Sequence, residues 1–134
     1  MRVTVDFSWR EAGVLSLNAG RIVFPSAPAA AGIYRFDLGD RVYIGETDQL
    51  KRRFQGYRTP GARQATNIRL NSALTSVLSN GHPASAATVT NAVVDVDVDG
   101  TRAPLDLTYK AARLLVESAA LVAERLQGRA VENL

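Results

Sequence analysis

Two tyrosines, Tyr34 and Tyr43, lie in the stretch "GIYRFDLGDRVYIG", where two short apolar segments are separated by a turn. A tight "DLGD" turn predicts an antiparallel hairpin that sets the two phenols directly opposite each other on one face. A shorter loop with Gly39 in the left-handed conformation would instead stagger them. Tyrosines on strands usually pack in the core with a solvated hydroxyl, so the hairpin alone leaves both a packing role and a catalytic role open.

A stretch without any carboxylate extends from Gln49 to Val94 in a chain whose formal net charge is +3. Such a stretch favours contact with a polyanion such as nucleic acid. In the alternative interpretation, its cations lie on solvated helix faces and are neutralised by acids elsewhere in the fold. The cations are Lys51, Arg52, Arg53, Arg58, Arg63 and Arg69.

Composition limits the other possibilities. The chain has 134 residues, 46% of them apolar and 22% charged, which fits one compact domain with one core. It has no cysteine, which excludes disulfides and thiolate metal sites, and its single histidine, His82, cannot anchor a zinc ion alone. No apolar run approaches the ~18 residues that cross a bilayer, and the first residues lack the apolar core of a signal peptide. We therefore expect a cytoplasmic protein without a membrane partner.

The elements that must position these residues follow from apolar spacing. Alternation predicts strands at 3–7, within 14–24, in the hairpin, and at 94–98. A short helix is expected from an N-cap at Thr47 or Asp48 to Gly56, and a second helix from Thr66 to the "NGHP" loop. A last helix is predicted from Asp106 to Leu126, with a core side made of Leu107, Ala111, Leu114, Leu115 and Val122. We thus expect an α/β (α+β) fold, a small central antiparallel sheet flanked by helices, with an N-terminal β extension (1–30) before the main domain (31–134).

A second motif competes with the hairpin. The stretch "DVDVDGTRAPLD", Asp95 to Asp106, matches the spacing of a calcium-binding loop. However, the residues before it are β-branched rather than helical, and the last position is Asp rather than Glu. An alternating strand that leads into an Asp99-Gly100 turn accounts for the same residues, and we favour that interpretation.

The intact "GIY" at 32–34 and "YIG" at 43–45 resemble the defining motifs of the GIY-YIG nuclease family. The resemblance extends along the chain, since the family has an arginine on the following helix, where this chain has Arg53, and an aromatic residue or histidine one turn later, where it has Tyr57. The family also has a helical metal-binding glutamate followed by an asparagine, and Glu117 and Asn133 have that relation. The sequence departs from the family in a shorter hairpin and in Glu46, which follows the second motif and either supports a metal or caps the next helix. We favour the cap.

The resemblance implies a reaction. Hydrolysis of a phosphodiester needs a deprotonated water, neutralisation of charge on the phosphoryl oxygens and protonation of the leaving alkoxide. Glu117 would bind Mg²⁺ (or Mn²⁺), Arg53 would stabilise the transition state, and Tyr34 or Tyr43 would accept the proton of water. The roles of the two tyrosines stay open. Tyr57 and Asn133 complete the expected catalytic set.

The sequence therefore predicts a magnesium-dependent endonuclease that acts on nucleic acid, with DNA as the first choice. Its expected binding track consists of Lys51, Arg52, Arg58, Arg63 and Arg69. Two other functions remain possible: a nucleic-acid-binding module that has lost cleavage, and a partner-binding module on the same fold. Specificity would come from the N-terminal residues, from a homodimer or from a larger protein.

Overall fold

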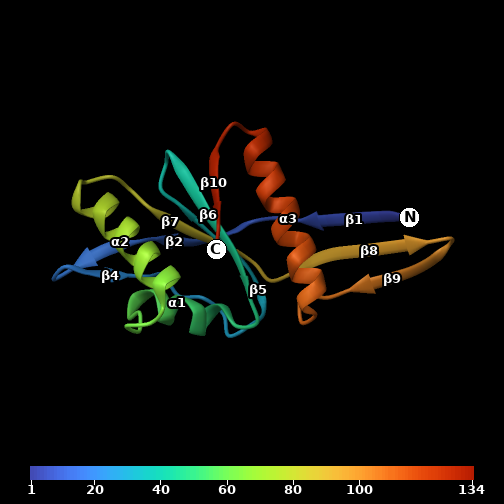
Figure 1. Ribbon diagram of the computed structural model, residues 1–134, viewed down its shortest axis with the longest axis horizontal. Helices are drawn as coiled ribbons and strands as arrows, with labels where there is room; N and C mark the ends of the chain where they lie inside the picture. The colour runs from blue at the N-terminus through green and yellow to red at the C-terminus, as the bar shows by residue number, and fades with distance from the viewer.

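The motif tyrosines lie on two of the three inner strands of a five-stranded sheet in the structure, a computed structural model that describes residues Met1–Leu134 (Figure 1). The strand order is β10-β6-β5-β7-β2, and all neighbours are antiparallel except β10, which runs parallel to β6. The sheet is therefore mixed rather than purely antiparallel. Its strands are β2 (Arg10–Val14), β5 (Gly32–Asp37), β6 (Arg41–Thr47), β7 (Ser85–Val89) and β10 (Ala130–Asn133).

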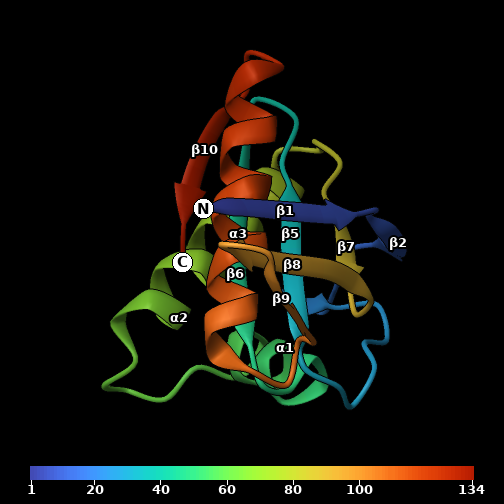
Figure 2. The ribbon, with the colours of Figure 1, turned by 90° about the vertical axis from the view of Figure 1, so that its right-hand side faces the viewer.

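Helices cover both faces of this sheet, as Figure 2 shows for α3 in front of β5 and β6. Helices α1 (Leu50–Arg58) and α2 (Ala65–Ser79) pack on the face that carries Tyr34 and Tyr43. Helix α3 (Lys110–Leu126) packs on the opposite face. The aliphatic residues Ile33, Val42 and Ile44 are fully buried there, as the alternation along the hairpin predicted. The expected α+β class is confirmed, and none of the three helices is long and apolar enough to span a bilayer.

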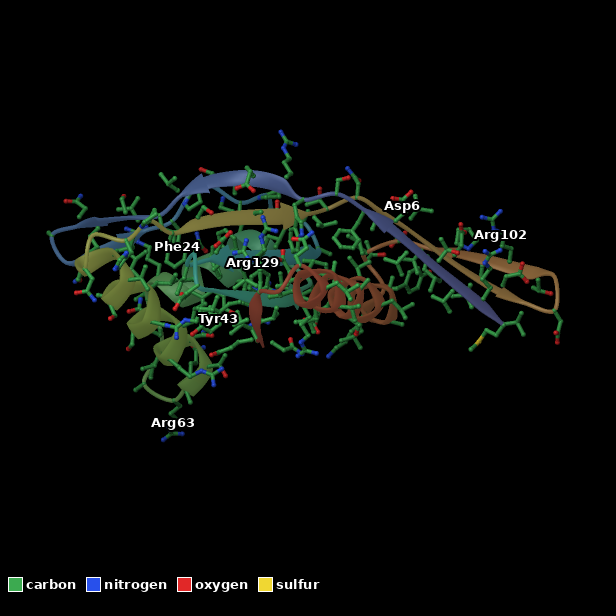
Figure 3. The ribbon with its side chains drawn as sticks, turned by 90° about the horizontal axis from the view of Figure 1, so that it is seen from above. Asp6, Phe24, Tyr43, Arg63, Arg102 and Arg129 are labelled. Carbon is green, nitrogen blue, oxygen red and sulfur yellow. The ribbon has the colours of Figure 1, made fainter.

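A second sheet extends from one end of the molecule as an arm (Figures 1 and 3). It consists of β1 (Arg2–Phe7), β8 (Ala92–Val98) and β9 (Thr101–Leu105), in the order β1-β8-β9. A small hairpin of β3 (Ser16–Asn18) and β4 (Arg21–Val23) lies at the other end. The N-terminal residues thus contribute strands to the arm, to the main sheet and to this hairpin.

The motif hairpin has a different register from the predicted one. Tyr34 pairs with Gly45, and Tyr43 pairs with Phe36, so the tyrosines share a face but are not directly opposed. The turn is centred on Gly39 and Asp40, closed by a bond from the Leu38 amide to the Arg41 carbonyl. Gly39 has a φ of 90°, and its amide donates to the Asp37 carboxylate, which fixes the turn one residue later than expected.

The start of α1 also differs from the prediction. The N-cap is Gln49, and no side chain caps the helix. Thr47 is used instead in a local turn, in which its hydroxyl accepts from the Gln49 amide, and Asp48 pairs with Arg52 at 2.7 Å. Glu46 does not cap the helix either, because it lies on the opposite side of the sheet, against α3.

The buried side of helix α3 differs from the side that the spacing of its leucines predicted. It begins at Lys110, and Leu114 and Val122 are 44% and 54% exposed. Ala111 is exposed and Leu115 is half-buried, while Leu107 is buried but precedes the helix. The buried positions are Ala112, Arg113, Val116, Glu117, Ala120 and Glu124. Charged residues therefore lie among the core residues of this helix.

The acidic stretch after β7 forms a hairpin, as the alternation predicted. Strands β8 and β9 pair directly up to Val98 and Thr101, with Asp99 and Gly100 both at positive φ in a two-residue turn. Asp95 pairs with Arg102 across the strands at 2.6 Å. The aspartates are spread along a strand and form no calcium loop. His82 is exposed in the loop before β7, also as expected.

Candidate active site

The two motif glycines lie where a neighbouring strand or side chain leaves no room for a Cβ atom. A Cβ atom on Gly45 would collide with the Tyr34 hydroxyl, so the tyrosine ring lies across the backbone of β6 where a side chain would otherwise be. A Cβ atom on Gly32 would collide with the Val89 carbonyl oxygen of the adjacent strand β7. Both glycines are therefore required by close packing, and the one in "YIG" serves the tyrosine in "GIY".

Tyr34 is hydrogen-bonded to Tyr57 of α1, with 2.5 Å between the two hydroxyl oxygens. Both side chains are almost fully buried. Burial raises the pKa of Tyr34 far above its usual value, and the neighbouring Tyr57 raises it further. Burial also raises the pKa of Tyr57, although the hydrogen bond from Tyr34 and the charge of Arg53 act in the opposite direction. At neutral pH the two phenols are therefore protonated, and Tyr57 ionises more readily.

Arg53 supplies a positive charge beside this pair. Its side chain is exposed and forms no ion pair, and its charge lowers the pKa of both Tyr34 and Tyr57. It lines a polar cavity of about 270 Å³ between the start of α1 and the start of α2, together with Arg52, Gln64 and Asn67. An unpaired guanidinium at an open cavity is suited to binding a phosphate group.

Glu117 is a buried carboxylate without a cationic partner. It is 6% exposed and takes part in no salt bridge. Its pKa is raised by burial and by the negative charge of Glu46, and a hydrogen bond from Asn133 lowers it. Its charge in turn raises the pKa of Tyr34. Glu117 therefore shares its electrostatic environment with the tyrosine pair, although it comes from α3 on the other side of the sheet.

Arg113 could have neutralised Glu117, since it lies one turn earlier on the same helix. Its Nε atom instead donates to Glu46 at 2.7 Å, and its Nη1 atom donates to the carbonyls of Leu107 and Thr108 at 3.0 Å. The guanidinium is thus fully engaged away from Glu117. The four-residue spacing of Arg113 and Glu117 suggested a pair between them on the helix, and the structure pairs Arg113 with the distant Glu46 instead.

Strand β10 brings Asn133 to Glu117. It runs parallel to β6 with Asn133 beside Ile44, on the face that α3 covers. The pairing ends there, so the last residues of β6, from Gly45 onward, have no strand on that side. Strand β10 thus brings Asn133 to the face of the sheet that carries Glu117.

Tyr43 stands apart from these residues. It is buried on the α1 and α2 face, and the Arg41 guanidinium lies 5.6 Å from its ring centre. Burial raises its pKa, as does Glu132 on β10, whereas Arg41 and Arg69 lower it. None of the groups that affect Tyr34 affects Tyr43. The structure brings together Tyr34, Arg53, Tyr57, Glu117 and Asn133, and leaves the second motif tyrosine outside this group.

The predicted binding track consists of exposed cations, but they do not lie on one face. Arg52 is beside Arg53 at the candidate site, and Arg63 lies in the loop between α1 and α2, at the outer limit of the molecule in Figure 3. Arg69 is on α2, near Tyr43. Lys51 and Arg58 lie on the other side of α1, where both line a cavity that Arg53 does not line.

A divalent cation fits the donor set at Glu117. A buried carboxylate is stable as an anion only with a cationic partner, and here the adjacent arginine is occupied. The neighbouring Asn133 donates a hydrogen bond to the carboxylate, which favours its anionic form. No cluster of three or more acidic or histidine side chains is present, so water and substrate oxygens would supply the other ligands, as is usual for Mg²⁺.

No family model matches the sequence, and no curated protein matches it. Among solved structures, the chain is similar to bacteriophage T4 EndoII, determined for a variant in which a glutamate is replaced by alanine. The TM-score is 0.55 with 21% identity, over 90% of this chain and 88% of the EndoII chain. This similarity shows that the two chains share a fold, which is the GIY-YIG nuclease-like fold expected from the sequence.

Proposed function

We propose that this protein is a GIY-YIG-type endonuclease that hydrolyses phosphodiester bonds in nucleic acid, with DNA as the first candidate and Mg²⁺ or Mn²⁺ as cofactor. The fold similarity to EndoII supports a nuclease-type function. The observation that carries the proposal is Glu117, a buried carboxylate without a cation, whose charge acts on Tyr34 together with the charge of Arg53. A permanent cation, an anion that needs a cation and a pair of proton-carrying hydroxyls are the groups that phosphodiester hydrolysis requires.

In this proposal Glu117 holds the metal ion and Asn133 orients its carboxylate; the metal, when bound, would acidify water and offset negative charge on the phosphate. Arg53 binds the phosphoryl oxygens from the cavity at the start of α1 and stabilises the charge that develops on them. Its lack of an ion-pair partner supports this role, because the guanidinium is free to bind substrate.

Of the two motif tyrosines, Tyr34 is the better candidate for contact with the attacking water. Arg53 and Glu117 both influence it, and its hydroxyl forms a chain with Tyr57 along which a proton can move. Since Tyr34 is protonated at neutral pH, its oxygen first orients the water as a hydrogen-bond acceptor while its proton points to Tyr57. Tyr43 lacks these neighbours, and we assign it a packing role that supports β6 and β10.

The test is incubation of the protein with plasmid DNA, branched DNA and structured RNA, in Mg²⁺, in Mn²⁺ or in EDTA. We expect metal-dependent cleavage by the wild type and none by Glu117→Gln. The matched control is Asp6→Asn, which removes an exposed carboxylate from the arm. Equal cleavage by the wild type and by Glu117→Gln would contradict the proposal. Binding without any cleavage would favour a nucleic-acid-binding module on this fold.

A further inference from the structure

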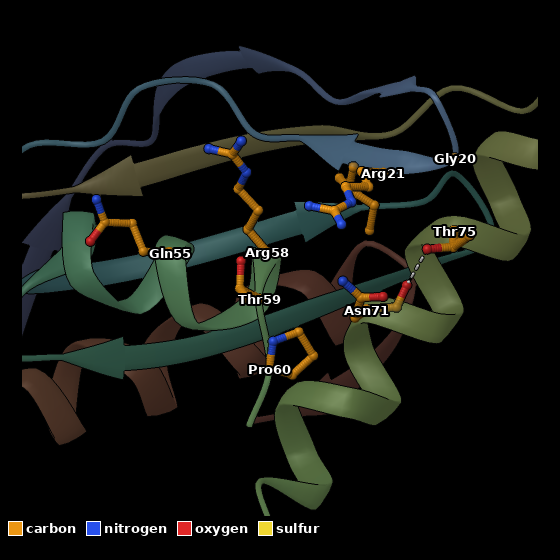
Figure 4. A pocket seen from close by; sticks show the side chains of 9 residues that line it. Gly20, Arg21, Gln55, Arg58, Thr59, Pro60, Asn71 and Thr75 are labelled. Atoms are coloured by element: carbon orange, nitrogen blue, oxygen red, sulfur yellow. Dashed lines mark hydrogen bonds between the residues drawn. The ribbon is translucent and has the colours of Figure 1, made fainter. Parts of the chain in front are cut away.

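Two adjoining cavities follow the outer side of α1, away from Arg53. The first, about 370 Å³, is bounded by the tip of the β3–β4 hairpin, the end of α1 and α2, with Arg21 and Arg58 on its walls (Figure 4). The second, about 270 Å³, lies between α1 and the segment 23–27, with Lys51 on its wall. Gln55 and Arg58 line both cavities. The two therefore form one groove, which we call the α1 groove.

The α1 groove is strongly basic. Lys51, Arg58 and Arg21 are exposed, none of them forms an ion pair, and no carboxylate lines either cavity. Asn71 and Thr75 of α2 add polar groups at the far wall, where the Thr75 hydroxyl donates to the Asn71 carbonyl and the Asn71 side chain donates to the Tyr57 carbonyl (Figure 4). Three unpaired cations with polar neighbours favour an anionic ligand.

The spacing of the cations favours an extended anion over a single one. Lys51 and Arg58 are separated by two turns of α1, about 10 Å along the helix axis. One phosphate group cannot contact two cations this far apart, so a chain of several phosphates fits this spacing better than a single anion. Arg21 approaches the same end from β4, as Figure 4 shows for its guanidinium and that of Arg58.

An apolar wall faces the cations in the second cavity. Val23, Phe24 and Pro25 line it opposite Lys51. The Phe24 ring is half-buried and is held by edge contacts to Phe36 at 5.8 Å and by Phe54 at 5.9 Å, so it is fixed in orientation. A basic groove with a fixed aromatic wall is typical of sites for single strands, whose unpaired bases can stack on the ring.

The α1 groove is separate from the candidate active site. The cavity at Arg53 shares no lining residue with either part of the groove. We propose that the groove binds a single-stranded segment of the nucleic acid that the active site cleaves. This inference rests on the proposed function and adds a substrate class to it: a duplex that carries an unpaired tail or flap beside the cleaved region.

The test compares the affinity of Glu117→Gln protein for a blunt DNA duplex and for the same duplex with a short single-stranded tail. We expect the tail to strengthen binding by at least about tenfold, the effect of stacking one base. Adding Arg21→Ala and Arg58→Ala should remove that gain and lower the slope of log Kd against log salt by about 0.7 for each lost phosphate contact. Adding Phe24→Leu, which keeps the side chain apolar, should remove part of the gain without changing the salt slope.

The matched control is Arg125→Ala, which removes an exposed, unpaired arginine from α3 on the other side of the sheet. It should keep the full effect of the tail. Equal affinity for blunt and tailed duplexes, or a full effect of the tail in the Arg21→Ala and Arg58→Ala protein, would overturn the groove proposal even if the wild type cleaves DNA. Tail-dependent binding by a protein that cleaves nothing would overturn the proposed nuclease function and leave the groove in place.

Discussion

The two faces of the five-stranded sheet handle polar groups differently. On the α1 and α2 face the core is aromatic, and its buried hydroxyls satisfy each other, as Tyr34 and Tyr57 do. On the α3 face the core is aliphatic, and the helix carries three charged residues into it. The two faces are linked electrostatically, because the charge of Glu117 raises the pKa of Tyr34.

Charges on the α3 face are compensated with one exception. Glu124 pairs with Arg35 at 2.7 Å and with Arg129 at 3.4 Å. Arg113 pairs with Glu46 at 2.7 Å. Glu117 has the same surroundings and no such partner. The comparison indicates that α3 can bury charge when it is paired, and the unpaired carboxylate is the exception that our proposal explains by metal binding.

The largest expected effect is that of Glu117→Gln on cleavage. The substitution keeps the shape of the side chain and removes the anion that would bind the metal, so the single-turnover rate should fall by about a thousandfold or more. Affinity for nucleic acid should change little. Single-turnover assays at saturating protein and matched Mg²⁺ measure this, and a variant that cleaves near the wild-type rate would remove Glu117 from the mechanism.

Arg53→Ala should have the next largest effect. If the guanidinium stabilises the transition state, the single-turnover rate at saturating protein should fall by about 10² to 10³, with a smaller loss of affinity. The matched control is Arg52→Ala, since Arg52 lines the same cavity but is paired with Asp48. Equal losses in the two variants would mean that Arg53 is one phosphate contact among several.

The two tyrosines provide a sharper test of which residues form the site. Tyr34→Phe should slow cleavage by about a hundredfold, because it removes a hydroxyl that handles the proton of water. It should also lower the free energy of unfolding by about 1 kcal/mol, because the buried Tyr57 hydroxyl loses its partner. Tyr43→Phe should leave the rate close to wild type. A larger rate loss for Tyr43→Phe than for Tyr34→Phe would exchange their roles.

The smallest effect concerns the dependence of stability on pH. The pKa of Glu117 is higher in the folded protein than in the unfolded chain. As pH rises above about 4.5, the unfolded chain therefore loses this proton first, and the folded protein loses it only at higher pH. Ionisation therefore costs the wild type stability in that range, and Glu117→Gln avoids the cost. We expect the variant to gain stability relative to the wild type between weakly acidic and neutral pH, measured by urea unfolding without divalent ions. If the difference in unfolding free energy between Glu117→Gln and the wild type stayed constant across this pH range, the raised pKa would be contradicted.

Part of this arrangement was predictable from the sequence. The hairpin strands, α1, α2 and the β8 strand have clear apolar spacing, and their positions were predicted within a few residues. The register of the hairpin was not predicted correctly, because "DLGD" allows turns centred on different residues. Only the conformation of Gly39 decides between them. Strands β7 and β10 were missed because "SAATV" and "AVEN" are too short and too polar to show a pattern.

The site was predictable only through its resemblance to a family. Apolar spacing favoured a core side of α3 that includes Leu114, whereas the buried side includes Arg113 and Glu117. The reason is that the partner of Arg113 is Glu46, which lies far away in sequence, so no local pattern reveals the pairing. The role of Gly45 as space for the Tyr34 ring likewise depends on a contact across strands.

Strand β10 is the last of the described elements to be synthesised, so the five-stranded sheet is completed last. It joins the sheet beside β6, and its residues leave the ribosome after every other element of the fold has been made. A nascent chain that ends before α3 can form the tyrosine pair and present Arg53, yet it lacks both Glu117 and Asn133. Under the proposed mechanism such a chain could not cut nucleic acid, and cleavage would become possible only once β10 docks beside Ile44.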